Sequence, residues 1–380
     1  MRTILFDRSR STTDWDCSRK RYWQYEHDGR GIVPNVTAIA LYMGQVLHDG
    51  LAAIAHGEKD KNLDIDIIAT TAFKQLFEAL SADNDSFAGV QYANEQAALI
   101  EGLLRAFYKG AWPTLMATYP EIVAIEQEML YKHDGFGQPN PKGPYSFMAK
   151  PDLVLADAEG LLTYIEYKST SSKKDEWINS WSSQIQIHST MKAIEASLER
   201  PVGAVIVQGL YKGYQAYGKQ SSPFCYAYAK NGHAPFYKPE LSYEYKAGFK
   251  RTPTWELEQG IKGWVEGMPL ELLASQLPQT PPIFLNEDLV LSFFKQRAIR
   301  ETEIRMAMDM LNAEDDSEVK EAIMHTSFPQ KFSACNPGWG KECEYRHLCF
   351  GSKGDPLSMG YQVRVTHHEP ERLDQEKREK

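Results

Sequence analysis

The chain has 380 residues, 42% hydrophobic and 12% aromatic, a composition typical of an ordered globular protein with about two domains or one elaborated domain. It has no apolar run near the roughly 18 residues of a membrane helix and no apolar signal-peptide core, so we expect a cytoplasmic protein without a membrane partner. The net charge of −9 argues against nonspecific coating of nucleic acid, but it leaves room for a local basic groove.

A basic and aromatic segment lies near the N-terminus. Hydroxyl side chains at 11–13 can cap a helix, which predicts a helix over about 14–27 with Cys17 inside it. The three basic residues 19–21 are interleaved with aromatic ones, a pattern found both in nucleic-acid contacts and in ordinary amphipathic surface helices. Both interpretations are open at this point.

Three helices are predicted next, over about 36–56, 65–82 and 92–111. The first places Gly44 and His48 one helical turn apart. A single histidine on an apolar helix is usually a buried or boundary residue, and a metal ligand is the less common alternative. The other two helices are amphipathic and carry no evident chemistry, so we expect them to cover a sheet.

Two β-strands are predicted at 121–131 and 145–156, joined by a loop rich in glycine and proline. The second strand is expected to form a hairpin with 161–167 through a turn at 157–160. On the first strand, Glu126 is ordinarily interpreted as part of a solvated edge. A supporting acidic role is the alternative.

The hairpin brings acidic and basic side chains together. It places Asp152 near Glu166, and Lys168 leaves the same face of the strand as Glu166. Two carboxylates and a lysine suit phosphodiester hydrolysis, because oxygen ligands hold Mg²⁺ or Mn²⁺ and a lysine can orient water or neutralise phosphate. Such a short pattern in isolation is more often an exposed strand with outward charges.

A helix is predicted after this strand. Its residues Trp177, Trp181, Gln184 and His188 recur at spacings of 4, 3 and 4, which places them on one helical face. A buried strand at 201–210 follows.

The remainder of the chain is less regular. Strands are predicted at 221–228 and 237–245, and helices at 254–266 and about 286–311. We expect the following organisation: an N-terminal segment (1–34), a core with a helical insert (35–215), an accessory mixed region (216–330), a cysteine segment (331–353) and a charged tail (354–380).

Three cysteines lie within fifteen residues, at Cys335, Cys343 and Cys349, and this clustering points to a metal centre rather than to packing. A tetrahedral site needs a fourth ligand, for which Cys17 is the first candidate, ahead of Cys225 and His347. Thiolate ligands alone do not separate zinc from an iron–sulfur cluster.

Pro151-Asp152, followed by Glu166-Tyr167-Lys168, resembles the signature of the PD-(D/E)XK nuclease superfamily. Gly44-x-x-x-His48 resembles the first motif of its RecB-like branch. Gln184-x-x-x-His188 resembles the Gln-x-x-x-Tyr motif of that branch, with histidine in place of tyrosine. The order of Cys17 and the three later cysteines is similar to the iron–sulfur staple of AddB-type and CRISPR-associated RecB-like exonucleases.

The resemblance implies an α/β fold with a restriction-endonuclease-like core (α-β-β-β-α-β), helical additions and a staple joining the two ends of the chain. It implies that His48, Asp152, Glu166 and the main-chain carbonyl of Tyr167 ligate Mg²⁺ or Mn²⁺. Lys168 would position the attacking water, and Gln184 would hold the lysine or the substrate. The four-cysteine site would be a [4Fe-4S] cluster, with zinc as the alternative.

The resemblance therefore implies a metal-dependent DNA exonuclease that acts on DNA ends or single strands in recombination, repair or replication. The sequence has no Gly-x-x-x-x-Gly-Lys-Ser/Thr motif, so a helicase or annealing partner would be a separate chain. Two alternatives are a DNA-binding or assembly subunit of a recombination or CRISPR-adaptation complex and a zinc-stapled regulatory module without catalysis.

Overall fold

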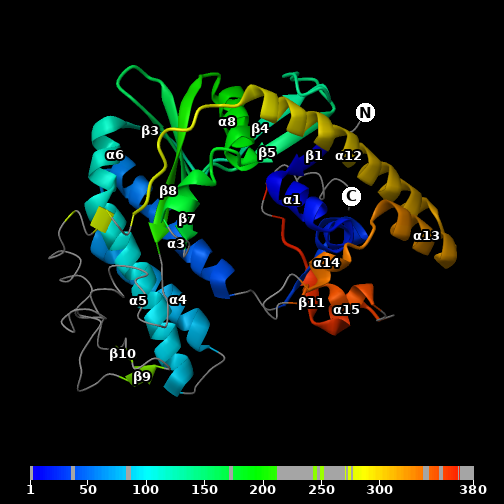
Figure 1. The fold of residues 1–380 in the computed structure, drawn as a ribbon, viewed down its shortest axis with the longest axis horizontal. Helices are drawn as coiled ribbons and strands as arrows, with labels where there is room; N and C mark the ends of the chain where they lie inside the picture. Colours follow the sequence, from blue (N-terminus) through cyan, green and yellow to red (C-terminus); the bar gives the residue numbers. More distant parts are fainter. Residues whose placement is uncertain are drawn as a thin grey trace.

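The computed structural model describes most of the chain (Figure 1). The described residues are 3–35, 39–82, 87–170, 174–211, 243–245, 249–251, 270, 273–274, 277–336, 342–350, 354–366 and 368. The predicted strand at 221–228, the predicted helix at 254–266 and Cys225 lie outside these ranges. The described part is a mixed α/β structure.

The larger sheet has the order β3-β6-β7-β8. Its strands are β3 (Glu121–Ile125), β6 (Leu153–Ala156), β7 (Leu162–Thr170) and β8 (Val202–Tyr211). β6 runs antiparallel to both of its neighbours, whereas β7 and β8 are parallel. The parallel pair is connected through α8 (Ile185–Leu198), and β7 is buried along most of its length because both faces of the sheet are covered.

One face of this sheet is covered by four helices. These are α3 (Ile39–Lys59), α4 (Ile65–Ser81), α5 (Phe87–Gly110) and α6 (Trp112–Thr118). Ile165 and Tyr167 of β7 pack into this helical layer, while Tyr164 points to the opposite face, as the two-residue period of a strand requires. The three helices predicted for this part of the chain are confirmed as α3, α4 and α5.

The opposite face packs against α8 and the long helix α12 (Glu287–Ala313). Phe293 and Phe294 of α12 and Met191 of α8 belong to this second core. The helix predicted at about 286–311 is therefore confirmed. Asn286 caps it by accepting a hydrogen bond from the main-chain N–H of Leu289 (3.0 Å).

A second sheet has the order β1-β5-β4. Its strands are β1 (Ile4–Asp7), β5 (Tyr145–Ala149) and β4 (Met129–His133). The predicted strands 121–131 and 145–156 are thus each divided in two, so the expectation of two uninterrupted strands is wrong. Glu126 adopts a positive φ of 43° at the first break, and its N–H donates to the carbonyl of Asp152 at the second (3.1 Å). One long hairpin therefore bends at this level and passes from one sheet to the other.

The helix predicted from Trp177 to His188 is also interrupted. The structure has α7 (Lys174–Asn179) and α8, separated by a turn, and Gln184 is the extended N-cap residue of α8 (φ −77°, ψ 114°). Trp177 and Trp181 pack edge to face with ring centroids 5.8 Å apart and join the core. The prediction of one continuous helical face is therefore wrong.

The N-terminal and C-terminal segments lie side by side (Figure 1). The predicted helix at 14–27 is replaced by α1 (Arg8–Asp16), α2 (Ser18–Arg21), a π-helical turn η1 (Tyr22–Glu26) and a 3₁₀ turn η2 (His27–Gly29). The cap of α1 is Asp7, which accepts from the N–H of Arg10 (2.7 Å), and not one of the predicted hydroxyls.

The C-terminal elements follow α12. They are α13 (Ser317–Ser327), α14 (Phe332–Cys335), α15 (Arg346–Cys349), η5 (Pro356–Met359) and β11 (Tyr361–Val363). β11 pairs antiparallel with β2 (Ile32–Pro34), and a separate short hairpin consists of β9 (Tyr243–Tyr245) and β10 (Phe249–Arg251). Every helix in the described part of the chain is too short or too polar to cross a membrane.

Candidate active site

The bend in the long hairpin positions Asp152. One carboxylate oxygen, Oδ2, accepts a hydrogen bond from the main-chain N–H of Tyr167 on the neighbouring strand (2.7 Å). The other, Oδ1, lies 3.2 Å from Nδ1 of His48, which projects from the middle of α3. Burial lowers the pKa of His48, but the hydrogen bond and the charge of Asp152 outweigh it and raise that pKa overall.

Three side chains converge at this bend. His48, Glu126 and Asp152 each offer one ligand atom, and these atoms all lie within 4.8 Å of one another. Two carboxylate oxygens and one imidazole nitrogen, all partly buried, form a donor set that suits a divalent cation such as Mn²⁺ or Mg²⁺. The residues present therefore fit the metal that the sequence motifs imply.

Glu166 and Lys168 form a second, more buried part of the site. Glu166 is only 3% exposed, and its Oε1 contacts both the ammonium of Lys168 and the side-chain amide of Gln186. Burial raises the pKa of Glu166, the charge of Lys168 lowers it, and the charge of Asp152 raises it further. The pKa of Glu166 is therefore raised overall, as expected for a buried carboxyl group close to a second acid.

A cavity of about 240 Å³ lies at this part of the site. Asp152, Glu166, Lys168 and Gln186 contribute to its wall, and Arg8 of α1 contributes from the N-terminal side. A cavity lined by three carboxylates, two lysines and an arginine can bind a phosphate together with a cation, which is the arrangement that phosphodiester hydrolysis requires.

The sequence matches a family model of the PD-(D/E)XK nuclease superfamily over residues 9–350 of the 380. The chain belongs to this superfamily. Its membership implies a metal-dependent nuclease, a phosphodiesterase for which DNA is the expected substrate. No curated protein sequence matches the chain significantly.

The predicted residues of this nuclease are distributed unevenly in the structure. His48 and Asp152 are together, and Glu166 and Lys168 are paired beside them. Glu126, expected only as an accessory residue, joins His48 and Asp152 in the group that could hold a metal ion. Tyr167 is buried, and its main-chain N–H holds Asp152.

Gln184 and His188 lie elsewhere. Gln184 is exposed at the start of α8. His188 is 1% exposed; its Nδ1 accepts from the N–H of Asn286 (3.3 Å), and its Nε2 lies 3.0 Å from the carbonyl of Ser182. The ring of His188 therefore joins the turn before α8 to the start of α12.

Sequence reasoning missed Gln186 and Arg8. Gln186 lies two residues after the predicted Gln184, and its direction depends on where α8 begins, which the sequence pattern does not show. Arg8 lies before the basic segment 19–21, and no motif of the sequence marks it. Its position depends on the parallel pairing of β1 with β5, whose paired residues are about 140 positions apart in the chain.

The structure brings Cys17 close to the C-terminal cysteine segment. The main-chain N–H of Lys331 donates to Sγ of Cys17 (3.5 Å), and the N–H of Cys343 donates to the carbonyl of Cys335 (2.9 Å). Burial raises the pKa of Cys349 to about 11, and the charges of Cys343 and Cys17 act in the same direction. Four thiols from distant parts of the chain therefore share one region.

Proposed function

We propose that this nuclease is an exonuclease that acts on DNA ends or single strands in recombination, repair or replication and requires Mg²⁺ or Mn²⁺. The convergence of His48, Glu126 and Asp152 beside the Glu166–Lys168 pair supports metal-dependent phosphodiester hydrolysis. The action on ends or single strands rests on the resemblance of the motifs to those of RecB-like exonucleases. The metal, when bound, would supply a water of lowered pKa and would stabilise charge on the scissile phosphate.

His48, Asp152 and Glu126 would hold the cation, with Glu166 and the carbonyl of Tyr167 as the further ligands that the family motif implies. Both contacts to Glu166 are made by its Oε1, so Oε2 is the oxygen it would offer to a cation. The ammonium of Lys168, held by Glu166, would orient the attacking water or neutralise the phosphate. Gln186 would fix the Glu166 carboxylate, and through it the paired Lys168 that Gln184 was expected to hold.

Digestion of end-labelled single-stranded and double-stranded DNA tests this proposal. The wild type should release short labelled products in Mn²⁺ or Mg²⁺ and should leave circular single strands intact. Asp152→Ala and Lys168→Ala should each abolish the metal-dependent digestion of single-stranded and of double-stranded DNA. Lys295→Ala, an exposed residue of α12, is the matched control and should digest DNA as the wild type does. Equal activity of the wild type and the two site variants would exclude this catalytic site, and cleavage of circles would replace an exonuclease by an endonuclease.

We also propose that Cys17, Cys335, Cys343 and Cys349 bind a [4Fe-4S] cluster, as in the RecB-like branch. The supporting observation is the proximity of Cys17 to the C-terminal cysteine segment. Thiols with raised pKa values become ligands when a metal displaces their protons. Anaerobically purified protein should be brown and contain iron, and Cys343→Ser should lose the colour. A colourless wild type that contains zinc would replace the cluster by a zinc site.

A further inference from the structure

A second cavity adjoins the active-site cavity. Its volume is about 480 Å³, twice that of the active-site cavity at about 240 Å³. The two cavities share Asp7, Arg8, Ser9 and His368 as lining residues, so they adjoin between the bend at Asp152 and the N-terminal helices. A ligand chain bound in one cavity would therefore lie next to the other.

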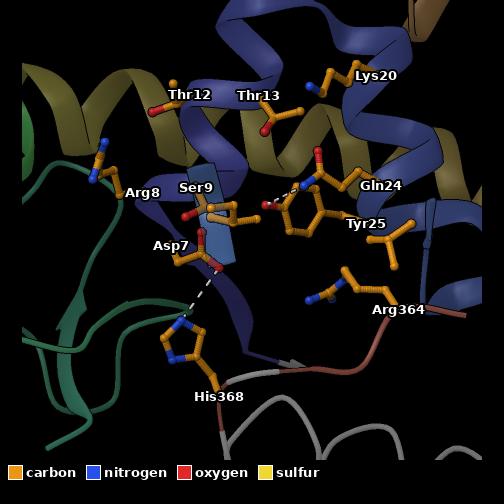
Figure 2. Close-up of a pocket in the computed structure, with 12 residues that line it drawn as sticks. Asp7, Arg8, Ser9, Thr12, Thr13, Lys20, Gln24, Tyr25, Arg364 and His368 are labelled. Atoms are coloured by element: carbon orange, nitrogen blue, oxygen red, sulfur yellow. Dashed lines mark hydrogen bonds and ion pairs between the residues drawn. The ribbon is translucent and has the colours of Figure 1, made fainter. Parts of the chain in front are cut away.

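The wall of the second cavity carries hydrogen-bond donors and cations (Figure 2). Ser9, Thr12, Thr13 and Gln24 supply hydroxyl and amide groups, and Lys20 and Arg364 supply positive charge. Figure 2 shows these side chains around one space; they project from α1, α2, η1 and the C-terminal segment. Hydroxyls, amides and cations together are the groups that contact the sugar–phosphate chain of nucleic acids.

Arg364 brings positive charge to the wall of this cavity beside Tyr25. Its guanidinium group lies 4.8 Å from the ring centroid of Tyr25, which also lines the cavity. Burial and the neighbouring charge of Arg10 lower the pKa of Arg364 to about 10, although Tyr25, Asp7 and Glu26 act in the opposite direction. An anion placed here would relieve the repulsion between the arginines.

The opposing charges are few and are engaged. Asp7 caps α1 and lies 3.9 Å from Nε2 of His368. Lys20 pairs with Glu344 at 2.8 Å, near the rim. The exposed side chain of Arg8 lies where the two cavities meet, close enough to Glu166 for their charges to interact. Arg8 could therefore contact a phosphate that spans the junction.

We propose that the second cavity is a subsite for a single DNA strand, which holds the nucleotide and phosphate next to the scissile phosphate. This inference rests on the proposed nuclease function. The junction at Arg8 would receive the phosphate between the two nucleotides, and Arg364 would receive the next one. The subsite would align the strand so that the scissile phosphate enters the bend at Asp152.

Binding of a fluorescein-labelled oligothymidylate of about 12 nucleotides, measured by anisotropy with Ca²⁺ in place of Mn²⁺, tests the subsite. Gln24→Glu adds one negative charge to the wall without a change in shape, and it should weaken binding about tenfold. Gln296→Glu makes the same change on the exposed face of α12 and should leave binding unaltered. A second variant, Arg364→Gln, should weaken binding and reduce the slope of the logarithm of the binding constant against the logarithm of the salt concentration by about one.

Hydrolysis of a minimal phosphodiester, bis(p-nitrophenyl) phosphate, separates the subsite from the chemistry. Gln24→Glu should retain this hydrolysis in Mn²⁺ and lose efficiency only on the oligonucleotide. Unchanged oligonucleotide binding in both Gln24→Glu and Arg364→Gln would overturn the subsite, whatever the activity. If instead both variants lose binding while the wild type shows no metal-dependent hydrolysis, the subsite stands and the proposed nuclease function fails.

Discussion

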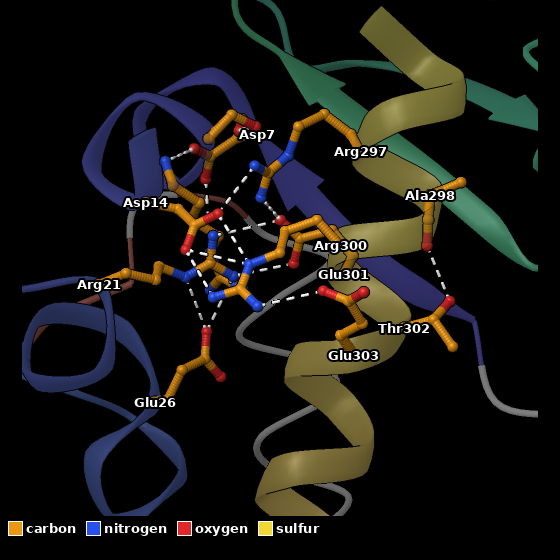
Figure 3. Close-up of polar contacts among 12 residues, drawn as sticks. Asp7, Asp14, Arg21, Glu26, Arg297, Ala298, Arg300, Glu301, Thr302 and Glu303 are labelled. Carbon is orange, nitrogen blue, oxygen red and sulfur yellow. Dashed lines mark hydrogen bonds and ion pairs between the residues drawn. The ribbon is translucent and has the colours of Figure 1, made fainter. Parts of the chain in front are cut away.

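Two clusters of charge lie in this molecule, and they are built in opposite ways. In the first, Figure 3 shows Arg21 and Arg297 of distant segments meeting at Glu301. Arg21 donates to both oxygens of Glu301 (3.2 and 2.9 Å), Arg297 donates to the same carboxylate (2.5 Å), and Arg297 also reaches Asp14 (3.0 Å). These four residues are at most 7% exposed, and each carboxylate faces guanidinium groups.

The second cluster is the active site, where each carboxylate has a single basic partner: Lys150 for Glu126 (2.8 Å), His48 for Asp152 (3.2 Å) and Lys168 for Glu166. Ligand oxygens of Glu126 and Asp152 lie within 4.8 Å of each other, and both side chains are partly open to solvent. Burial raises and Arg300 lowers the pKa of Asp14, with a net decrease, whereas the pKa of Glu166 is raised overall. In the first cluster, carboxylates shared among several guanidinium groups form a buried structural network, whereas in the second the ligand atoms of His48, Glu126 and Asp152 form a group that could hold a cation.

Loss of Asp152 should have the largest effect on activity. Asp152→Asn keeps the size of the side chain and its hydrogen bond from Tyr167 but removes a charged ligand. Cleavage should fall on the order of 10³-fold, because stabilisation of transition-state charge is lost. Thermal stability should stay the same or rise, because a repelling carboxylate is gone. Cleavage rates and thermal melting curves check this prediction, with Asp309→Asn on the exposed surface of α12 as the control. A loss of stability with normal cleavage would show that Asp152 has a structural and not a catalytic role.

Loss of Glu301 should have the opposite signature. Glu301→Gln leaves Arg21 and Arg297 without their shared counter-ion, and it should lower the free energy of unfolding by about 3 kcal/mol. The matched control is Glu303→Gln, whose exposed pair with Arg300 (3.2 Å) should contribute less than about 1 kcal/mol. Urea denaturation measures both. Similar losses in the two variants would show that the buried network has no special structural role.

Metal addition should stabilise the active-site cluster in the absence of DNA. Mn²⁺ at about 100 times its Kd should raise the free energy of unfolding by about 2.7 kcal/mol, because it binds the folded state. Glu126→Gln should reduce this effect, and Glu159→Gln, in the exposed hairpin turn, should not. Thermal melting with Mn²⁺ and with a chelator checks it. A loss in Glu166→Gln but not in Glu126→Gln would show that Glu166 is the ligand and Glu126 is not.

Much of the fold could be predicted because local patterns determine it. The hydrophobic period gave α4 and α12 to within about two residues, and the turn at 157–160 was recognisable from its sequence. Gly160 adopts a φ of 83° there, and the N–H of Asp157 donates to Leu161 (3.1 Å). Asp152 could be placed beside the Glu166 strand for the same reason.

The bend at Glu126 could not be predicted, because a non-glycine residue with positive φ is uncommon and has no sequence signal. Its stabilising contact is to Asp152, which comes from another strand. Gln186 was missed because α8 begins later than the pattern indicates. In both cases a tertiary contact, rather than local sequence, determines which side chain reaches the site.

The smallest predicted effect on stability concerns His133, a buried histidine surrounded by aromatic rings, which extends the comparison to a titratable group outside both clusters. Its ring is fully buried and stacks with those of Tyr131 (5.9 Å) and Tyr145 (5.3 Å). Burial lowers its pKa from 6.5 to about 4, although Asp134 acts in the opposite direction. The unfolded chain therefore takes up a proton below about pH 6.5 that the folded protein refuses, and stability falls as pH decreases from there toward about 4.

The contribution of His133 to this loss should be roughly 2 kcal/mol between about pH 8 and pH 5. His133→Phe cannot titrate, so its free energy of unfolding should change less over this range than that of the wild type. The matched control is His325→Phe on the exposed face of α13, which should keep the wild-type pH dependence. Urea denaturation at the two pH values gives the difference. An equal loss of unfolding free energy in His133→Phe and the wild type would mean that the His133 ring is protonated in the folded protein. Burial among aromatic rings would then not be sufficient to keep this histidine neutral.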